Sequence, residues 1–183
     1  MFHASYLLYL RANANRHYNR EWLYLDGSRI CLMIALVALI ALSAIFSSTE
    51  TAYSSVNMIR LKQMVKSGNK KAKTAYTISK NFTAVITTIL IGNNVVNILA
   101  TSLATALLTD IFGTSGVALA TAVMTILILV FGEIAPKIVA KAKAESFVLL
   151  VAKPLSVMVT IFRPISFVVE SLEGHWEKKM DIE

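Results

Sequence analysis

Glu133 is the only charged residue in the apolar segment 115–136, and it lies three residues before Pro136. A carboxylate at membrane depth costs several kcal/mol unless something compensates it, so such a residue commonly marks an ion or proton pathway. Proline has no N–H and its ring displaces the carbonyl four residues earlier, which predicts that the Gly132 carbonyl lacks a helical partner. An unpaired carbonyl inside a membrane must be satisfied by protein, water or an ion. The kink therefore offers a backbone oxygen beside a carboxylate.

Polar side chains also recur at helical spacing in the two earlier apolar segments. Ser43 and Ser47 are four residues apart, so both hydroxyls project from one stripe of a helix. Asn93 and Asn97 repeat this spacing, whereas Asn94 is turned away by about a third of a turn. Each of the two helices is therefore predicted to present a pair of oxygen ligands.

The candidate ligands share one chemistry, because all of them are oxygens and only one carries a charge. They are the side chains of Ser43, Ser47, Asn93, Asn97 and Glu133 and the backbone carbonyl of Gly132. Mg²⁺ demands about six oxygens in octahedral array, whereas Ca²⁺ prefers more carboxylates and a looser geometry. Na⁺ also suits neutral oxygens with one carboxylate, so the residues by themselves leave Mg²⁺ and Na⁺ open.

Softer metals and enzymatic chemistry find no support at membrane depth. Cys31 is the single cysteine, which excludes a thiolate cluster and an intramolecular disulfide. His3, His17 and His175 lie outside the apolar segments, although zinc and copper sites favour imidazole or thiolate ligands. No nucleophile and base pair occurs at a workable depth either. The sequence therefore predicts a protein that is not an enzyme.

Each polar group also has a purely structural interpretation. Serine in membrane helices often bonds to the backbone or permits close packing, and asparagine often bonds between helices. Gly132 and Pro136 together are a common kink without any ligand. Glu133 could pair with Lys137 near the membrane interface. The coincidence of the three polar features on three separate segments is what favours an ion site.

Three apolar segments, at about residues 30–49, 82–108 and 115–136, are each long enough to cross a hydrocarbon core of about 30 Å as a helix. A mean hydropathy of +0.62 agrees with a membrane protein. The net charge of +7 is concentrated in the loop after the first segment, which contains Arg and Lys but no acidic residue from position 51 to 81. By the positive-inside rule this loop and the C-terminus are cytoplasmic, and the N-terminus is outside a plasma or inner membrane. We assign the basic loop to orientation and lipid headgroup contact, not to nucleic acid binding.

The segments that flank the spans are assigned more coarsely. Residues 1–27 are predicted to be an N-terminal extracytoplasmic segment whose role the sequence does not show. Residues 50–80 are expected to form a cytoplasmic basic helical hairpin that is broken near Gly68. Residues 173–183 form a polar tail.

Residues 138–172 are expected to form juxtamembrane helices. Within them the apolar stretch 147–162 is long enough to suggest a fourth crossing, but Lys153 and Pro154 divide it midway. Two half-length segments suit helices that lie in the inner interface better than one spanning helix. The predicted fold is therefore an all-α integral membrane protein with three transmembrane helices plus juxtamembrane or interfacial helices.

Three motifs resemble the signatures of the CorC/CNNM family transmembrane domain, also called DUF21. They are LSAIFSSTETA at 42–52, IGNNVVN at 91–97 and FGEIAPK at 131–137, in that order. The resemblance covers about residues 28–172. It implies a homodimeric, Na⁺-coupled Mg²⁺ exporter with three membrane helices and a juxtamembrane belt. In this family protein oxygens largely hold the bound Mg²⁺, which here would be those of Ser43, Ser47, Asn93, Asn97, Gly132 and Glu133.

Family members usually continue into paired CBS domains that bind nucleotide, and this sequence contains none. We therefore interpret it as an excised membrane domain or a short member, and nucleotide regulation is not carried over. Glu50 continues the stripe of Ser43 and Ser47 and is a candidate Na⁺ ligand. A Mg²⁺-binding sensor that regulates another transporter would use the same oxygens, so sequence does not separate it from a transporter. A purely structural membrane protein would not need the polar cluster.

Overall fold

The computed structural model describes the backbone of residues 27–180 and the side chains of residues 27–172. The N-terminal segment assigned to residues 1–27 therefore lies almost wholly outside the described residues. In chain order the elements are α2 (Gly27–Ser55), α3 (Met58–Lys66), α4 (Lys70–Ser79), α5 (Phe82–Phe112), α6 (Ser115–Leu127), the π-helix η1 (Ile128–Ile134), α7 (Ala135–Ala142), α8 (Ala144–Ile161) and α9 (Arg163–Met180). The predicted all-α class is confirmed over the described residues.

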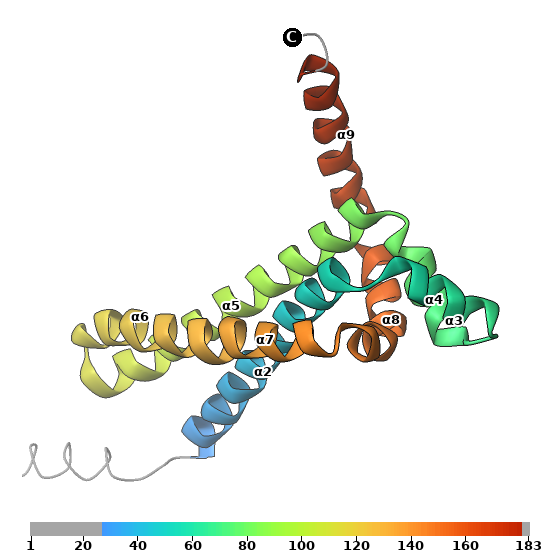
Figure 1. Cartoon of the computed structure of the whole chain (residues 1–183). Helices are drawn as coiled ribbons and strands as arrows, with labels where there is room; N and C mark the ends of the chain where they lie inside the picture. Colours follow the sequence, from blue (N-terminus) through green and yellow to red (C-terminus); the bar gives the residue numbers. More distant parts are fainter. Residues whose placement is uncertain (1–26, 181–183) are drawn as a thin grey trace, which may run out of the picture.

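Three long helical rods form the bundle: α2, α5, and the continuous rod α6–η1–α7 (Figure 1). α2 packs against α5, η1 and α7, and α5 packs against α6. α5 ends in a tight turn at Gly113, whose φ of +64° favours glycine, and α6 begins two residues later. Arg29 at the start of α2 reaches the same end, where its Nη2 lies 2.8 Å from Asp110 Oδ2. We call this end of the bundle the turn end.

The opposite end, which we call the hairpin end, carries the short polar helices α3 and α4. Asn57 caps α3 and Asn69 caps α4, and each side chain accepts two backbone N–H groups of the following turn. Between the helices Gly68 has a φ of +88°. The predicted break near Gly68 is therefore confirmed, because only a residue without Cβ adopts this conformation cheaply.

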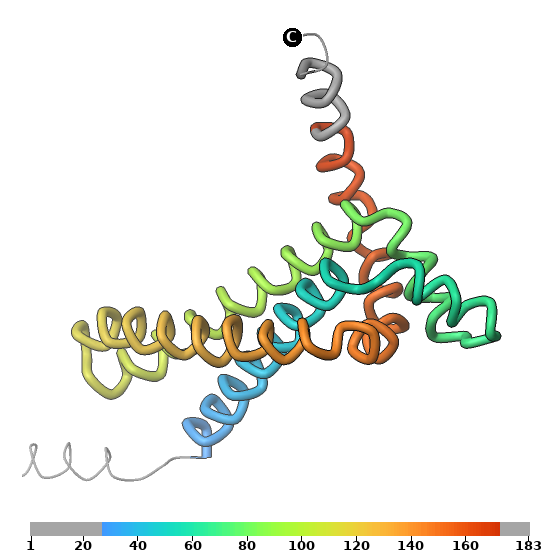
Figure 2. The backbone as a smooth tube through the Cα atoms, viewed as in Figure 1, coloured from blue at the N-terminus to red at the C-terminus, as the bar shows by residue number. Residues whose placement is uncertain are grey.

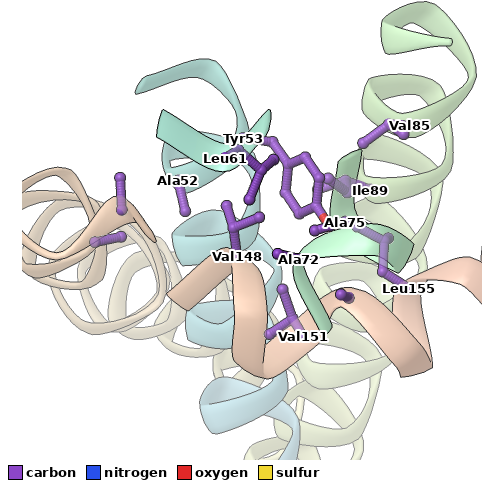
Figure 3. Packing of buried hydrophobic residues seen from close by; sticks show 13 residues of the cluster. Ala52, Tyr53, Leu61, Ala72, Ala75, Val85, Ile89, Val148, Val151 and Leu155 are labelled. Atoms are coloured by element: carbon purple, nitrogen blue, oxygen red, sulfur yellow. The ribbon is translucent and has the colours of Figure 1, made fainter. Parts of the chain in front are cut away.

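The largest buried cluster lies at the hairpin end and joins α2, α3, α4, α5, α7 and α8. Tyr53 from α2 places its ring among Leu61, Ala75 and Val148 in Figure 3. Ala72 and Ala75 of α4 are fully buried in the same cluster. Burial of these apolar groups holds the polar hairpin against the membrane rods.

Tyr53→Phe is expected to leave the protein as stable as before or to raise its melting temperature. The Tyr53 hydroxyl is buried without a hydrogen-bond partner among the described residues, and such a group costs about 1–3 kcal/mol. Each kcal/mol shifts the melting temperature by about 2–4 °C in a chain of this size. Circular dichroism melts in detergent would measure the change, with Tyr53→Ala as the destabilised control. A clear loss of stability in Tyr53→Phe would mean that the hydroxyl has a partner.

α8 differs from the sequence expectation. The stretch 147–162 was expected to form two half-length segments divided at Pro154, but the structure has one helix, Ala144–Ile161, with Pro154 inside it. Val148 and Val151 before the proline and Leu155 after it belong to the same buried cluster. Their burial on both sides outweighs the cost of about 3 kcal/mol for an interior proline.

By length and composition, four helical stretches of the described residues could cross a membrane: Gly27–Ser55, Phe82–Phe112, Ser115–Ala142 and Ala144–Ile161. The sequence predicted three spans, so the fourth candidate is α8. The first three contain the segments 30–49, 82–108 and 115–136, and each helix runs several residues beyond them.

α9 follows α8 and leaves the bundle at the hairpin end (Figure 2). Its first half contacts the start of α5, where Asn81 Nδ2 donates to Glu170 Oε1 at 2.9 Å. The helix continues to Met180, so the tail predicted to begin at residue 173 is not a separate element.

Candidate cation site

The two serines lie on the face of α2 that packs against the other rods. Ser43 and Ser47 are both fully buried, and they stand one turn apart as their spacing predicts. The Ser47 hydroxyl has no hydrogen-bond partner within the described part of the chain. A buried polar group normally has a hydrogen-bond partner, so this oxygen is a candidate to bind an ion or a water molecule from solution.

The two asparagines on α5 face the serines. Ser43 Oγ donates to Asn93 Oδ1 at 3.1 Å. One turn further along, Asn97 Oδ1 is buried and accepts no hydrogen bond from the described residues. Asn94 is exposed, as its position on the helix predicts. The predicted pairs therefore meet at one contact, and the two unpaired oxygens lie one turn from it in opposite directions, because α2 and α5 run antiparallel.

Gly92 explains why α2 and α5 approach so closely at this level. A Cβ on residue 92 would lie 2.5 Å from Cε1 of the Phe46 ring, so no larger residue fits without moving that ring. Phe46 lies between the two serines in sequence, and Gly92 precedes Asn93. Close packing at this glycine thus brings the Ser43 hydroxyl within bonding distance of the amide.

The kink before Pro136 takes a form that the sequence did not predict. Residues Ile128–Ile134 form the π-helix η1, in which the N–H of Ala135 donates to Val130 O, five residues earlier. Pro136 would supply the donor for Gly132 O in α-helical pairing and for Phe131 O in π-helical pairing. The missing N–H therefore affects a carbonyl of this same turn in either register. The signal that could have suggested the π-turn was the glycine four residues before the proline.

Gly132 brings this turn against α2. A Cβ on residue 132 would lie 2.9 Å from Ser43 Oγ and 3.4 Å from Ser43 Cβ. The backbone of η1 thus touches the hydroxyl that bonds Asn93. Ser43, Asn93 and Gly132, which come from three different rods, therefore lie side by side.

Glu133 follows Gly132 and is half-buried. It lines a cavity of about 320 Å³ with residues of α5, α6 and η1: Thr101, Thr121, Met124, Thr125, Ile128 and Leu129. Among the described side chains its carboxylate makes neither a hydrogen bond nor an ion pair. Lys137, the partner considered from sequence, instead pairs with Glu50 at 3.2 Å. Glu133 is therefore a carboxylate within a candidate membrane span that the described residues do not neutralise.

Comparison with known proteins identifies the family of this chain. A family model of the cyclin M (CNNM) transmembrane N-terminal domain matches residues 34–182. The chain belongs to this family. The match begins six residues later than the 28–172 expected from the three motifs and ends ten residues further on, so it includes the whole of α9.

Relatives of this CNNM domain occur in bacteria and plants. The chain is 40% identical over 134 residues to a UPF0053 protein of Haemophilus influenzae, which covers 73% of this chain and 32% of the relative. It is 42% identical over 104 residues to the UPF0053 inner membrane protein YfjD of Escherichia coli, and this alignment covers 57% of this chain and 24% of the relative. A chloroplastic DUF21 domain-containing protein of Arabidopsis thaliana is 37% identical over 139 residues, covering 76% and 21%. The chain thus spans about a third or less of the length of these curated relatives.

Two further contacts fix the kink of the CNNM domain to α2, and the sequence did not predict them. Ser48 Oγ donates to Pro136 O at 3.3 Å, so the proline carbonyl is anchored one residue after Ser47. The ion pair of Glu50 with Lys137 lies one turn beyond Ser47. Ser48 and Glu50 therefore position the kink, and Glu50 is already engaged by a cation of the chain.

The oxygens of the CNNM domain at this level divide into two groups. Ser43, Asn93 and Gly132 are in contact, and the unpaired oxygens of Ser47 and Asn97 lie one turn away in opposite directions along the bundle; we call these five residues the inner cluster. Glu133 lies beside them in sequence and lines the adjoining cavity. Within the described residues no three His, Cys, Asp or Glu side chains gather as a metal site. A cation bound here would depend on neutral oxygens and one carboxylate.

Proposed function

We propose that this CNNM domain binds Mg²⁺ within the membrane and transports it, with Na⁺ as the coupling ion. The observation that carries the proposal is the pair of buried oxygens without donors, on Ser47 and Asn97, beside the contact of Ser43 with Asn93. Buried oxygens without partners are costly, and a cation beside the contact of Ser43 with Asn93 would draw such oxygens toward it. With the kink carbonyl and Glu133, they supply the hard oxygen ligands that Mg²⁺ prefers.

Exchange for Na⁺ is supported by the charge balance at Glu133. Once Mg²⁺ leaves, an ionised carboxylate without a partner would stand at membrane depth, which is costly. A monovalent cation would offset this cost during the return step, and the same neutral oxygens suit Na⁺. Glu50 is less suitable as a Na⁺ ligand than proposed from sequence, because its carboxylate already forms an ion pair with Lys137. We therefore place the coupling at Glu133, in an alternating-access cycle that exports Mg²⁺.

Three crossings with the hairpin end in the cytoplasm suit the structure better than four. Glu145 at the start of α8 pairs with Arg60 of α3 at 3.1 Å, and Glu170 after α8 bonds Asn81 at the start of α5. Both ends of α8 thus stay near the hairpin end, and α8 packs on the lysine-rich helix α4. This supports an interfacial α8, an external N-terminus and a cytoplasmic C-terminus.

A homodimer is also part of the proposal. Ala118 and Ala122 are exposed on the face of α6 that turns away from the buried Gly116 and Ala120. Small residues four apart permit close approach of a second helix in a membrane. They make this face of α6 the candidate contact for a second copy.

Purified protein in liposomes that contain a Mg²⁺-sensitive dye would test transport directly. We expect Mg²⁺ movement that depends on an opposing Na⁺ gradient. The second candidate function is a Mg²⁺ sensor that regulates another transporter, since the same oxygens would bind the ion. Protein that binds Mg²⁺ but shows no movement under any Na⁺ gradient would favour the sensor.

Asn97→Ala is expected to weaken Mg²⁺ binding about tenfold, which corresponds to about 1.4 kcal/mol for one lost neutral ligand. The matched control is Asn94→Ala, because Asn94 is exposed on the same helix three residues earlier. Isothermal titration of Mg²⁺ into each purified variant would give both affinities. Equal affinities in the two variants would remove Asn97 from the site.

A further inference from the structure

The mainly apolar cavity beside Glu133 contains three threonines that the proposed Mg²⁺ site does not use. Its polar side chains are Glu133 of η1, Thr101 of α5, and Thr121 and Thr125 of α6. Along α5, Thr101 lies one turn closer to the turn end than Asn97. Along the third rod, Thr121 and Thr125 precede Glu133 and also lie toward the turn end. The cavity therefore adjoins the inner cluster on the side away from the hairpin.

Every threonine hydroxyl of this cavity already uses its proton. Thr101 donates to Asn97 O at 2.9 Å, Thr121 to Val117 O at 3.0 Å and Thr125 to Thr121 O at 2.7 Å. A hydroxyl has one donor and two acceptor lone pairs, so only lone pairs remain for the cavity. An ionised Glu133 likewise only accepts. The side chains thus offer the cavity three acceptor hydroxyls and a carboxylate, and they offer it no donor.

A cavity with acceptors alone favours a cation over an anion or a hydrogen-bonding solute. Its volume of about 320 Å³ far exceeds the roughly 30 Å³ that one water molecule occupies in the liquid. An ion in it would therefore keep much of its water. Mg²⁺ gives up water reluctantly, so a path past the buried serines of the inner cluster needs a place where water returns.

We propose that the cavity lined by Glu133, Thr101, Thr121 and Thr125 is a second cation position, in which Mg²⁺ is partly hydrated. This inference rests on the proposed transport function. Glu133 adjoins both positions. When a cation binds beside the threonines, the Glu133 carboxylate is engaged there and is no longer a ligand for the inner cluster. The two positions therefore exclude each other, and the ion passes from the inner cluster toward the turn end.

Cysteine accessibility in membranes tests this position without relying on transport. Cys31, the only cysteine, is first replaced by alanine, and Thr101→Cys and Thr125→Cys are then introduced singly. The matched controls are Ser102→Cys and Ile126→Cys, which are the adjacent, exposed positions. The thiolate, which forms in water, attacks the sulfur of a charged methanethiosulfonate reagent, forms a mixed disulfide and releases methanesulfinate, so we expect the cavity cysteines to react about tenfold faster than the controls. Mg²⁺ should slow the reaction at the cavity positions only, with K⁺ at equal ionic strength as the reference.

A second variant separates the cavity from the inner cluster. Adding Thr101→Val to Thr125→Cys removes one hydroxyl, and we expect it to weaken the Mg²⁺ protection of the introduced thiol severalfold while calorimetric Mg²⁺ affinity at the inner cluster is retained. Equal reactivity at cavity and control positions, or reactivity that ignores Mg²⁺, would overturn the second position. If Mg²⁺ protects the cavity but liposomes show no Mg²⁺ movement, transport is wrong and the cation position stands. If Mg²⁺ moves but does not protect, the position is wrong and transport stands.

Discussion

Glu133→Gln is expected to abolish measurable Mg²⁺ binding and Mg²⁺ movement. Glutamine keeps the shape and one oxygen of the side chain, so the substitution removes the charge and little else. Taking one charge from a buried ion pair costs about 3–5 kcal/mol, which weakens binding by about a hundredfold or more. Loss of one neutral ligand, as in Ser47→Ala, should cost only about tenfold. Titration calorimetry and the liposome assay would measure both quantities.

The same substitution should act on stability in the opposite direction. Without Mg²⁺, the carboxylate of Glu133 has no partner among the described side chains, so its removal should raise the melting temperature of the ion-free protein. Wild-type protein should instead gain stability when Mg²⁺ is added, and the variant should not. Glu145→Gln is the matched control, since Glu145 pairs with Arg60 at the hairpin end. An unchanged Mg²⁺ affinity in Glu133→Gln would remove this residue from the site.

The parts of the site that sequence predicted are those that follow from helical periodicity. Spacing of four placed Ser43 with Ser47 and Asn93 with Asn97, and the structure joins the two stripes at the Ser43 to Asn93 bond. Periodicity determines which side chains share a face of a rod. In an apolar surrounding, two polar faces are expected to pack against each other, because their groups can then form hydrogen bonds. The proline similarly predicted a disturbed turn around Gly132.

The parts that sequence did not predict depend on how the rods contact one another. A π-turn in place of a simple kink changes which carbonyl loses its donor, because Pro136 then faces Phe131 O and not Gly132 O. Lys137 pairs with Glu50 of another rod and not with Glu133 of its own. Pro154 was expected to end a helix, but burial of Val151 and Leu155 kept it continuous. In each case a contact between distant segments outweighed a local preference.

Gly132→Ala is expected to weaken Mg²⁺ binding by about 30- to 100-fold, or about 2–3 kcal/mol, because it displaces two ligands worth about 1–1.5 kcal/mol each. The new Cβ would lie 2.9 Å from Ser43 Oγ, so the hydroxyl must rotate away and lose its bond to Asn93. The kink carbonyl on the same turn must shift with it. Gly27→Ala is the matched control, because nothing lies within 4 Å of a Cβ at that position.

A double variant distinguishes a displaced ligand from a damaged fold. In Ser43→Ala with Gly132→Ala the crowded hydroxyl is gone, and the remaining distance between the two Cβ positions of 3.4 Å is an ordinary contact. Thermal stability should then return to near the wild-type value, whereas Mg²⁺ affinity should stay low because the Ser43 oxygen is missing. Recovery of both stability and affinity would show that Ser43 fills space and is not a ligand. Recovery of neither would show that the backbone of η1 needs glycine for its own geometry, so the three outcomes assign the role of this contact between α2 and the kink.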